Sequence, residues 1–412
     1  MRVHPAAPTA GLLAALVLTS GNSPAYGQGH ELMTRVDPHL ESYREALIEV
    51  RRDIHRHPEV SGAEERTAAV VAGRLKALGF EVRTGVGGHG VVGIIRGGQP
   101  GPVVAFRADM DAVPSNAPDP VSFASETPGV RHICGHDIHT TVGIALAEAL
   151  TSIRDDLPGT VMLIFQPAEE NTQGARAMIA DGVLEDPVPE AIFAFHTAPL
   201  EVGQIGSVEG LSLPGLDRVT ITVSGSGDLA SAVQSYRKAV TGVSTGQDVP
   251  PEDFVVAMIG RPRPRTDRGD WLIGGNIRAG SPEARVRARD QMEAGLAAVD
   301  APGVSYDFSY EEQALPDMVN DLELVRSTLE AIRSVVGQEG LLEINEVTPF
   351  FSEDFSLYQQ HIPGAMYWLG ASNAELGTVS MPHSPDFVAD EEAILVGAKV
   401  MTAVLLDYME KN

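Results

Sequence analysis

One short segment concentrates the residue types that bind metal ions. Between His132 and His139 the chain places three of its twelve histidines together with Cys134, its only cysteine. The order Cys134-Gly135-His136 lets a thiolate and an imidazole converge from a tight turn at the start of a helix. Thiolate and imidazole suit zinc and related ions. The pattern predicts a metal site, and a structural cluster of buried side chains is the alternative.

Two further segments place candidate ligands at the ends of predicted strands. Glu169 and Glu170 directly follow a predicted strand over 161–165, and His196 follows another over 191–195. Open α/β sheets build their sites at the carboxyl ends of strands. Adjacent carboxylates can divide labour, since one can bind a metal ion while the other activates water. A Glu-Glu pair alone is usually a solvated turn, and a lone histidine is usually a hydrogen-bonded core residue, so the coincidence of the segments carries the prediction.

The elements that must position these residues alternate between helices and strands. Helical spacing with an Asp37-Pro38 start predicts a helical region from 38 to 78. Short apolar runs bounded by glycines are typical of strands buried on both faces. The alternation indicates an α/β sheet sandwich. After the first helical region, the expected order is strands over 91–95 and 103–106, a helix over 135–150, a strand over 160–165, a helix over 174–181 and a strand over 191–195.

The order of predicted helices and strands changes after Pro214. The order strand, helix, strand, strand, helix, strand predicts a ferredoxin-like unit. Its members are expected over 217–223, 229–240, 254–259, 270–277, 282–299 and 304–310, with the Pro/Arg stretch 261–265 as a loop. A helix over 321–336, a strand over 365–369 and a final helix over 391–410 follow. The unit is therefore expected to be inserted into the first domain.

Composition excludes several classes of partner. With 56 acidic and 30 basic residues the formal net charge is −26, and such a surface repels phosphate backbones and anionic lipid. Nucleic acid and acidic membranes are therefore not expected as partners. A length of 412 residues and a hydrophobic content of 43% are ordinary for a soluble chain of two or three domain-sized units.

The first 27 residues predict export. Arg2 precedes an apolar run over 11–18, and small residues at Ala25 and Gly27 stand two apart before Gln28. This order is typical of a secretory signal peptide cleaved after Gly27, and the run is shorter than the about 20 residues that span a bilayer. A buried N-terminal helix is the alternative. We expect residues 1–27 to be a signal peptide and the mature protein to be periplasmic or secreted, without a membrane anchor.

Seven segments, taken in order, carry a recognisable pattern. The segments are 51–59 (RRDIHRHPE), 107–114 (RADMDAVP), 134–139 (CGHDIH), 166–170 (QPAEE), 195–196 (FH), 352–355 (SEDF) and 382–385 (PHSP). Together they resemble the amidohydrolase branch of the aminoacylase and glutamate-carboxypeptidase metallopeptidase superfamily, which includes hippurate hydrolases and indole-acetyl-amino-acid hydrolases. The resemblance spans roughly 38–212 and 318–405.

The resemblance implies a fold and a domain division. The fold is α/β, with a two-metal aminopeptidase-like catalytic sandwich and an inserted ferredoxin-like (β-α-β-β-α-β) lid domain. The catalytic domain is expected over 31–212 and 318–412, and the lid, which in relatives also forms dimers, over 213–317. A homodimer through the lid is a further possibility that the resemblance raises.

The resemblance also implies roles for single residues. Two divalent ions, which could be zinc, manganese, cobalt or nickel, are expected. Glu169 is expected to be the general base that takes a proton from a metal-bound water, and Asp111 to orient a ligand or tune that base. A capping or turn role is the alternative for Asp111. The expected metal ligands are Cys134, His136, Glu170, His196 and His383. Structural hydrogen bonding is the expected role of His55, His57, His139 and Glu353.

These roles define the expected reaction. An exported amidohydrolase or carboxypeptidase would hydrolyse the amide bond of N-acyl amino acids or small peptides that carry a free carboxylate. The alternative is a catalytically silent member that binds metal or ligand. A general base such as Glu169 favours the enzyme, because a binding protein has no need of one.

The predicted lid departs from the family. Relatives carry a Gly-x-Gly-x-His segment whose histidine reaches the substrate carbonyl, often across a dimer interface, whereas this chain has Asp228 at that position. We therefore expect weak activity on ordinary N-acyl amino acids unless another group compensates. The Asn-Val-Ile-Pro segment of relatives is missing, although Gly275-Asn276-Ile277-Arg278 is similar to their Gly-Thr-Val-Arg strand. Arg278 is the candidate substrate-binding residue of this domain.

Overall fold

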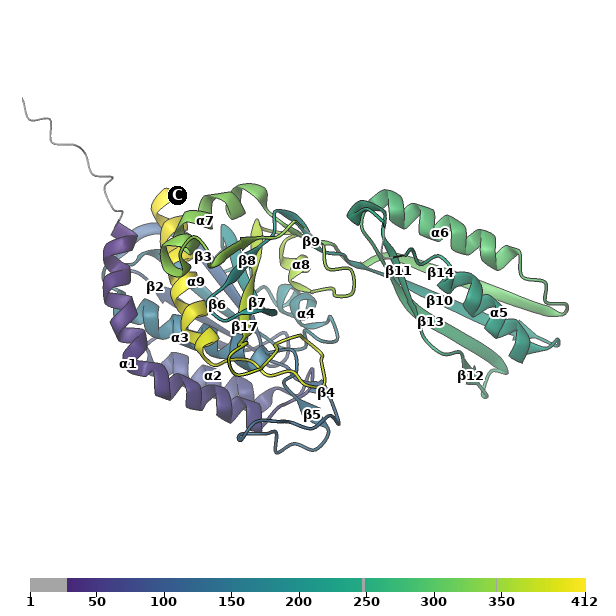
Figure 1. Cartoon of the computed structure of the whole chain (residues 1–412), viewed down its shortest axis with the longest axis horizontal. Helices are drawn as coiled ribbons and strands as arrows, with labels where there is room; N and C mark the ends of the chain where they lie inside the picture. The colour runs from purple at the N-terminus through teal and green to yellow at the C-terminus, as the bar shows by residue number, and fades with distance from the viewer. Residues whose placement is uncertain (1–27, 247–248, 346) are drawn as a thin grey trace, which may run out of the picture.

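The chain divides in space into a larger part and a smaller, elongated part (Figure 1). This computed structural model describes residues 28–246, 249–345 and 347–412. We call residues 28–212 and 318–412 the body and residues 213–317 the inserted domain, using the boundaries proposed from the sequence. The predicted signal peptide, residues 1–27, lies outside the described residues. Within the described ranges, no helix is both long and apolar enough to cross a membrane.

The body is built on an eight-stranded mixed sheet with the strand order β1-β2-β6-β3-β7-β17-β8-β16. Its centre is parallel, because β6 and β7 flank β3 and run in its direction, and β17 runs parallel to β7. The strands are β1 (Glu81–Val86), β2 (Gly90–Arg96), β3 (Gln99–Asp109), β6 (Pro158–Gln166), β7 (Ala191–Glu201), β8 (Ile205–Ser207), β16 (Leu341–Glu343) and β17 (Gly364–Ser372).

Helices cover both faces of this sheet, which explains its apolar strand sequences. Along β6, Val161 and Leu163 belong to one hydrophobic core, while Met162 and Ile164 belong to a second core on the opposite face. The first core includes residues of α1 (Gln28–Arg56), α2 (Glu65–Ala77), α3 (His136–Ser152), α7 (Leu322–Val336) and α9 (Glu392–Lys411), and the second includes residues of α4 (Gly174–Ala180) and α8 (Phe355–Tyr358).

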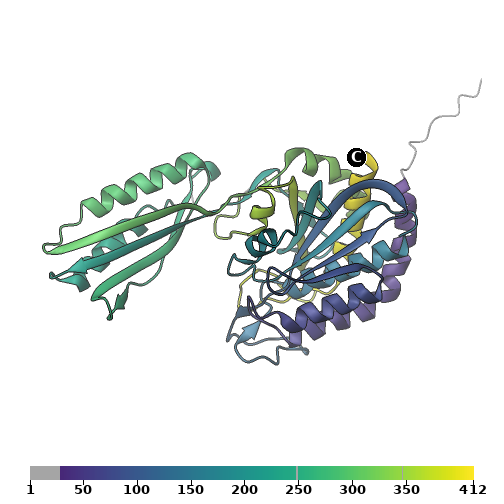
Figure 2. The same ribbon diagram turned by 180° about the vertical axis from the view of Figure 1, so that it is seen from behind.

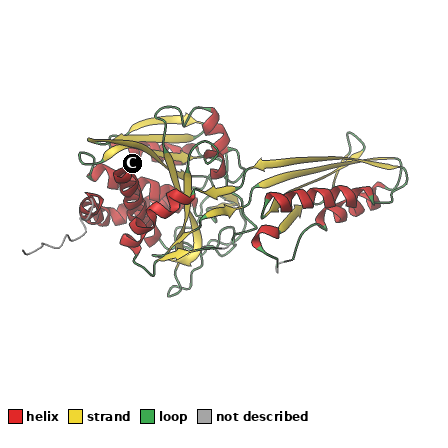
Figure 3. Ribbon diagram, turned by 90° about the horizontal axis from the view of Figure 1, so that it is seen from above, coloured by secondary structure: helices red, strands yellow, loops and turns green. Residues whose placement is uncertain are grey.

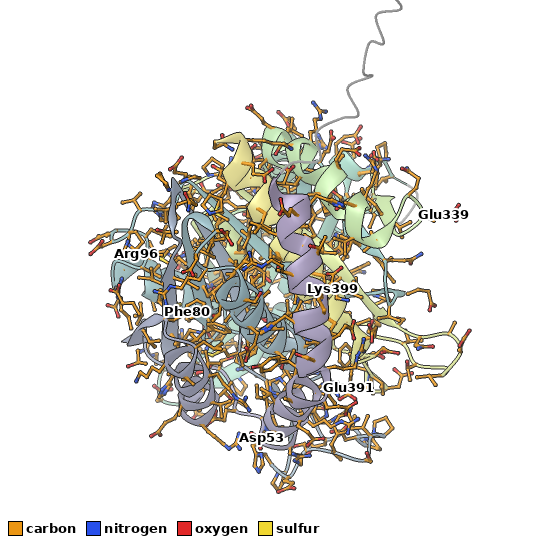
Figure 4. All side chains as sticks on the ribbon, turned by 90° about the vertical axis from the view of Figure 1, so that its left-hand side faces the viewer. Asp53, Phe80, Arg96, Glu339, Glu391 and Lys399 are labelled. Atoms are coloured by element: carbon orange, nitrogen blue, oxygen red, sulfur yellow. The ribbon has the colours of Figure 1, made fainter. Side chains whose placement is uncertain are left out.

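Helices α1 and α9 lie together on the outside of the body. Ion pairs join Arg52 to Glu391 and Lys399 to Glu41, and Figure 4 looks onto this side with Glu391 and Lys399 labelled. Surface pairs of this kind contribute little to stability. The packing of buried residues such as Leu40 and Leu47 therefore holds the two helices together.

The predicted helical region 38–78 is wrong in two respects. Helix α1 already runs through Pro38, which removes one backbone hydrogen bond, and buried Val36 and Leu40 on either side hold the helix against the core. The region also breaks after Arg56. Pro58 and a turn at Gly62, which adopts a φ of 84°, separate α1 from α2.

The inserted domain is a ferredoxin-like sheet with two helices on one face, as the sequence predicts (Figure 3). Its strand path is β11-β13-β10-β14, and its core includes Val219, Ile221, Ile273 and Ile277. The elements are β10 (Leu216–Gly225), α5 (Leu229–Thr241), the short 3-10 helix η1 (Pro251–Asp253), β11 (Val255–Ile259), β12 (Arg263–Arg265), β13 (Asp270–Ala279), α6 (Pro282–Ala297) and β14 (Val304–Leu315). The prediction of a loop over 261–265 is wrong, since β12 pairs with β13; Pro264 fits because the strand is at an edge.

A narrow junction joins the two parts (Figure 2). Strands β9 (Gly210–Leu213) and β15 (Met318–Asn320) pair antiparallel and lead the chain out of the body and back. Beside them, Arg285 is buried and binds the carboxylates of Asp217 at 3.1 Å and Asp317 at 2.9 Å. A buried guanidinium that satisfies two carboxylates fixes the base of the inserted domain. The remaining strands, β4 (Val113–Pro114) and β5 (Val130–Arg131), form a small pair near the start of α3.

Candidate metal centre

The predicted site residues converge at the carboxyl ends of the parallel strands. Glu169 and Glu170 follow β6, Asp111 follows β3, and His196 lies in β7 beyond its pairing with β3. His383 lies in the connection between β17 and α9. Parallel strands end at the same edge of a sheet, so these four separate segments meet there.

A glycine turn brings Cys134 and His136 into this cluster. Gly135 precedes α3 with a φ of 91°, and a Cβ atom there would lie 2.4 Å from Oγ1 of Thr197. The Thr197 hydroxyl donates to the carbonyl oxygen of Cys134 at 2.8 Å and holds the turn. Only glycine fits this position without displacing its neighbours. Cys134 and His136 are both buried.

The five predicted ligands form two overlapping groups around Cys134. Its Sγ lies 3.4 Å from Nε2 of His196, and Nε2 of His383 lies 3.2 Å from Oε1 of Glu170. Nε2 of His136 lies 3.7 Å from the same Glu170 oxygen. Ligand atoms around a tetrahedral ion with bonds of 2.0–2.3 Å are about 3.3–3.8 Å apart, so these separations suit an ion between them. The first group is Cys134, His136 and His196, and the second is Cys134, Glu170 and His383.

The opposite nitrogens of two histidines are already engaged. Nδ1 of His196 donates to the carbonyl oxygen of Thr197 at 2.8 Å, which leaves Nε2 with a free lone pair. Nδ1 of His136 lies 3.3 Å from Oδ1 of Asp111. A carboxylate or carbonyl behind the ring is the usual support of a metal-bound histidine. Asp111 therefore lies where it can orient His136.

Two ligand atoms of the site are suited to bind a cation. Nε2 of His136 and Oε1 of Glu170 are buried and have no hydrogen-bond partner within the described part of the chain. Burial would lower the pKa of His136, but the carboxylates of Asp109 and Asp111 outweigh burial and raise it to about 10. A field that favours a proton so strongly also favours a divalent ion. The donor set and the field are therefore suited to metal.

Two carboxylates hold the turn that carries Glu169 and Glu170. Ala168 adopts a left-handed φ of 55°, which is strained for a residue with a Cβ atom. Its backbone N–H donates to Oε1 of Glu64 at 2.7 Å, while the N–H groups of Glu169 and Glu170 donate to Asp111 at 3.2 and 3.0 Å. Burial, with a contribution from Asp111, raises the pKa of Glu64. We call Glu64 and Asp111 the carboxylate clamp.

A buried arginine organises the other side of Glu169. Arg107 donates to Gln166 at 2.9 Å, to Glu353 at 2.9 Å and to Asp354 at 3.1 Å. One oxygen from each of Glu169, Glu353 and Asp354 lies within 4.8 Å of the other two. Burial and these neighbouring carboxylates, Glu353 first, raise the pKa of Glu169 well above its ordinary value. Arg107 compensates only part of this negative charge.

The remaining histidines of the motifs make structural hydrogen bonds, as predicted. His139 is bound by Asp109 at 2.7 Å and accepts from the backbone N–H of Thr197 at 2.8 Å. Nδ1 of His55 lies 2.7 Å from Asp137, which also pairs with Arg51 at 2.8 Å. The segment 51–59 therefore ties α1 to the start of α3. Nδ1 of His57 bonds the backbone oxygen of Asp53 at 2.8 Å.

A cavity of about 780 Å³ opens above the cluster. Cys134, Glu169 and His383 line it together with the apolar side chains of Trp368 and Phe351. The inserted domain contributes Arg218, Asn276 and Arg278. Arg278 donates from Nε to the hydroxyl of Ser352 at 2.8 Å, and no carboxylate of the described residues pairs with it. Arg278 thus lines the cavity with a guanidinium that no carboxylate of the described residues neutralises, and its role in substrate binding stays a prediction.

Asp228 is not among the residues that line this cavity. It stands at the outer end of β10, which leaves the junction at Leu216 and runs toward the tip of the inserted domain (Figure 1). Its carboxylate caps α5 by accepting from the backbone N–H of Ser231 at 3.1 Å and from the Ser231 hydroxyl at 2.6 Å. Aspartate is a favoured residue at this position. Asp228 does not line the cavity of its own chain, so its effect on the reaction stays a prediction.

Sequence reasoning missed several residues around the site. Glu64 was not singled out, because it falls inside the predicted helical region 38–78, where an acidic residue is ordinary. Arg107 and Asp109 were noted only as members of a motif, and Trp368 only as part of a strand. A buried-site role for Arg107 could have been inferred from an arginine that directly follows an apolar run typical of a strand buried on both faces.

An α/β body with a cysteine, histidine and carboxylate cluster at its strand ends defines a metallohydrolase. The profile of peptidase family M20/M25/M40 matches residues 105–407, and the chain belongs to this family. Putative amidohydrolase YhaA of Bacillus subtilis is 34% identical over 92% of this chain and 98% of its own length. IAA-amino acid hydrolase ILR1-like 4 of Arabidopsis thaliana is 32% identical over 88% of this chain and 86% of its own.

A solved structure agrees. YXEP of Bacillus subtilis, described as a dinuclear metal binding peptidase of the M20 family, is 31% identical and superposes with a TM-score of 0.74, covering 90% of this chain and 99% of that one. The resemblance to amidohydrolases and the fold with an inserted domain are thus confirmed. The chain is a metal-dependent amide hydrolase of this family.

Proposed function

We propose that the protein hydrolyses the amide bond of N-acyl amino acids or small peptides with a free carboxylate. One observation carries the proposal. The two ligand groups around Cys134 lie beside the carboxylate of Glu169, in a cavity that Arg278 also lines. Such a cavity can hold an amide at the ligand groups and a carboxylate at the guanidinium. Hydrolase-named relatives, one of them named for amino acid conjugates, support this substrate class.

The residues have distinct tasks in this proposal. Cys134, His136 and His196 would hold one divalent ion and Cys134, Glu170 and His383 a second. When bound, the ions would lower the pKa of water and polarise the amide carbonyl. Glu169, whose Oε2 lies 3.9 Å from Nε2 of His136, accepts the proton of the attacking water and delivers it to the departing amine. Arg278 binds the substrate carboxylate through charge-assisted hydrogen bonds.

Water exclusion and positioning complete the mechanism. Trp368 and Phe351 give the cavity an apolar wall that can pack against the acyl group. The carboxylate clamp sets the direction of Glu169 and Glu170 through their backbone. Asp111 serves both the clamp and His136, so one residue aligns a ligand and the base.

Turnover of a substrate panel tests the proposal. The full mature chain, loaded separately with zinc, manganese, cobalt or nickel, is incubated with N-acyl amino acids and dipeptides, and the released amine is quantified. Hydrolysis with at least one ion, absent after chelation, is the expected result. A metal-loaded protein that releases no amine from any compound would instead be the catalytically silent, metal-binding member of the family.

Export of the mature chain is a separate part of the proposal. Its support is the signal-like order of residues 1–27. Mass spectrometry of the expressed protein should find an N-terminus at Gln28 in the periplasmic or secreted fraction. An intact N-terminus on protein retained in the cytoplasm would contradict it.

A further inference from the structure

The negatively and positively charged side chains that line the cavity come from different parts of the molecule. Its carboxylates, Glu169, Glu170 and Glu353, belong to the body. Arg218 and Arg278 are the only arginine or lysine residues among the described ones that line it, and both belong to the inserted domain. Both guanidinium groups therefore lie on one side of a single cavity, in a chain with a net charge of −26.

Strand register places these groups side by side. Arg218 of β10 is directly opposite Asn276 of β13, and Arg278 follows Asn276 by two residues. Directly opposed residues of an antiparallel pair point to the same face, and so do residues two apart on one strand. Arg218, Asn276 and Arg278 therefore share a face. Their neighbours Ile277 and Val219 are buried in the core on the opposite face, under α5 and α6.

The hydrogen-bond donors on this sheet face are only partly satisfied by other groups of the protein. Among the described residues, Arg278 bonds Ser352 and Met258 but no carboxylate. In the same part of the chain, the side chain of Asn276 has no hydrogen-bond partner. Arg218 pairs with Glu311 of β14 at 2.8 Å, and both side chains are more than half exposed. An exposed pair of this kind is weak, so a carboxylate in the cavity can compete for Arg218.

We propose that Arg218 and Asn276 form a second anion subsite beside Arg278. The substrate class is then an N-acyl derivative of an acidic amino acid, glutamate or aspartate, or a short peptide that ends in one. This inference rests on the proposed function. Arg278 binds the α-carboxylate, and the guanidinium of Arg218 with the amide of Asn276 binds the side-chain carboxylate. Arg218 exchanges Glu311 for the substrate when the ligand enters.

Charge-assisted hydrogen bonds give this subsite its selectivity. Bonds to charged groups contribute about twice as much as neutral ones. Glutamine has the size of glutamate without its charge, so the pair isolates this contribution. We expect the protein to prefer the glutamate compound by about tenfold, the factor that one such bond supplies in a partly solvated site.

Matched substrates and variants test the subsite. The metal-loaded full chain is given N-benzoyl-glutamate and N-benzoyl-glutamine, and kcat/KM is measured for both. The same two compounds are titrated calorimetrically into metal-loaded Glu169→Gln protein, which reports binding without turnover. Arg218→Gln should reduce the glutamate-to-glutamine ratio to near one in both assays. Arg326→Gln is the control, because Arg326 is also exposed and paired with a glutamate, Glu209, but does not line the cavity.

The assays separate the two proposals. A ratio of about ten that persists in Arg326→Gln and disappears in Arg218→Gln supports the subsite. Equal ratios in the unmodified and Arg218→Gln proteins overturn it. If no benzoyl compound is hydrolysed but the calorimetric preference remains dependent on Arg218, the subsite stands and the proposed hydrolysis of these compounds fails.

Discussion

The body and the inserted domain handle charge in opposite ways. In the body, Arg107, Asp109 and Asp354 are completely buried, and each is held by several partners. In the inserted domain, the charged residues that line the cavity lie on an open sheet face, where Arg218 has a single exposed partner. At the tip of that domain, Asp228 caps α5.

This difference has a consequence for function. A buried charge that loses a partner is strongly destabilising, so the residue types of the body site are tightly constrained. An open sheet face can exchange one polar residue for another at little cost in stability. We infer that the chemistry resides in the body, while the inserted domain is free to alter substrate choice.

The largest expected effect comes from changing Glu169. Glu169→Gln keeps a hydrogen-bonding side chain of the same size but cannot accept a proton. We expect turnover to fall about 10² to 10⁴-fold with the metal content unchanged. Rates and metal content are measured on the same preparation. Glu209→Gln, the same change at an exposed ion pair, serves as the control.

Retention of full turnover by metal-loaded Glu169→Gln protein would remove Glu169 from the proton-transfer role. The chemistry would then have to depend on another group near the ligands, and the contrast between the two regions would lose its main support.

A smaller effect is expected at the carboxylate clamp. Glu64→Ala leaves the N–H of Ala168 buried without an acceptor, so the turn that carries Glu169 relaxes. Displacement of a catalytic group by about 1 Å can reduce rates about 10²-fold, and we expect kcat per metal-loaded site to fall about 10- to 100-fold. The thermal unfolding temperature is recorded in parallel to identify the folded fraction.

Two variants distinguish positioning from general stability. Glu64→Gln retains an oxygen that can accept from Ala168 and should restore most of the activity. Glu65→Ala removes an exposed neighbour at the start of α2 and should behave as unmodified protein. Equal activity of Glu64→Ala and Glu64→Gln, per folded and metal-loaded molecule, would show that the clamp does not position Glu169.

The smallest effect is expected at the tip of the inserted domain. Asp228→Ala removes the cap of α5 and should lower the unfolding temperature slightly, whereas Asp228→Asn should preserve the cap and the stability. Turnover should be unchanged in both, because Asp228 does not line the cavity of its own chain. A rise in turnover in either variant would mean that this carboxylate does oppose the reaction.

Much of the body could be predicted from the sequence because its constraints are local. Apolar runs such as 161–165 give buried strands, and Gly135 between Cys134 and His136 identifies the turn before α3. The break between α1 and α2 was missed because helical spacing of apolar residues continues on both sides of it. The path of α1 through Pro38 was missed because tertiary packing outweighs the local penalty.

The site was predictable in its residues but not in its supports. The five expected ligands lie together, yet nothing in the sequence relates Glu64 to the N–H of Ala168, because that bond joins segments 104 residues apart. The role expected for Asp228 came from its place in the Gly-x-Gly-x-His segment of relatives. An aspartate at this place is equally expected as the cap of α5. The sequence could not distinguish a catalytic position from a capping position, since both put a polar side chain directly before α5.

Metal titration tests the central claim most directly. Chelated full-length protein receives increasing amounts of a divalent ion, and the ions bound per chain and the rate of amide hydrolysis are measured on the same samples. The rate should be absent without metal and should rise until two ions are bound, in keeping with the two ligand groups around Cys134. Full hydrolysis by the chelated protein, or saturation of the rate with no ion retained, would contradict a metal centre in the body as the origin of the activity.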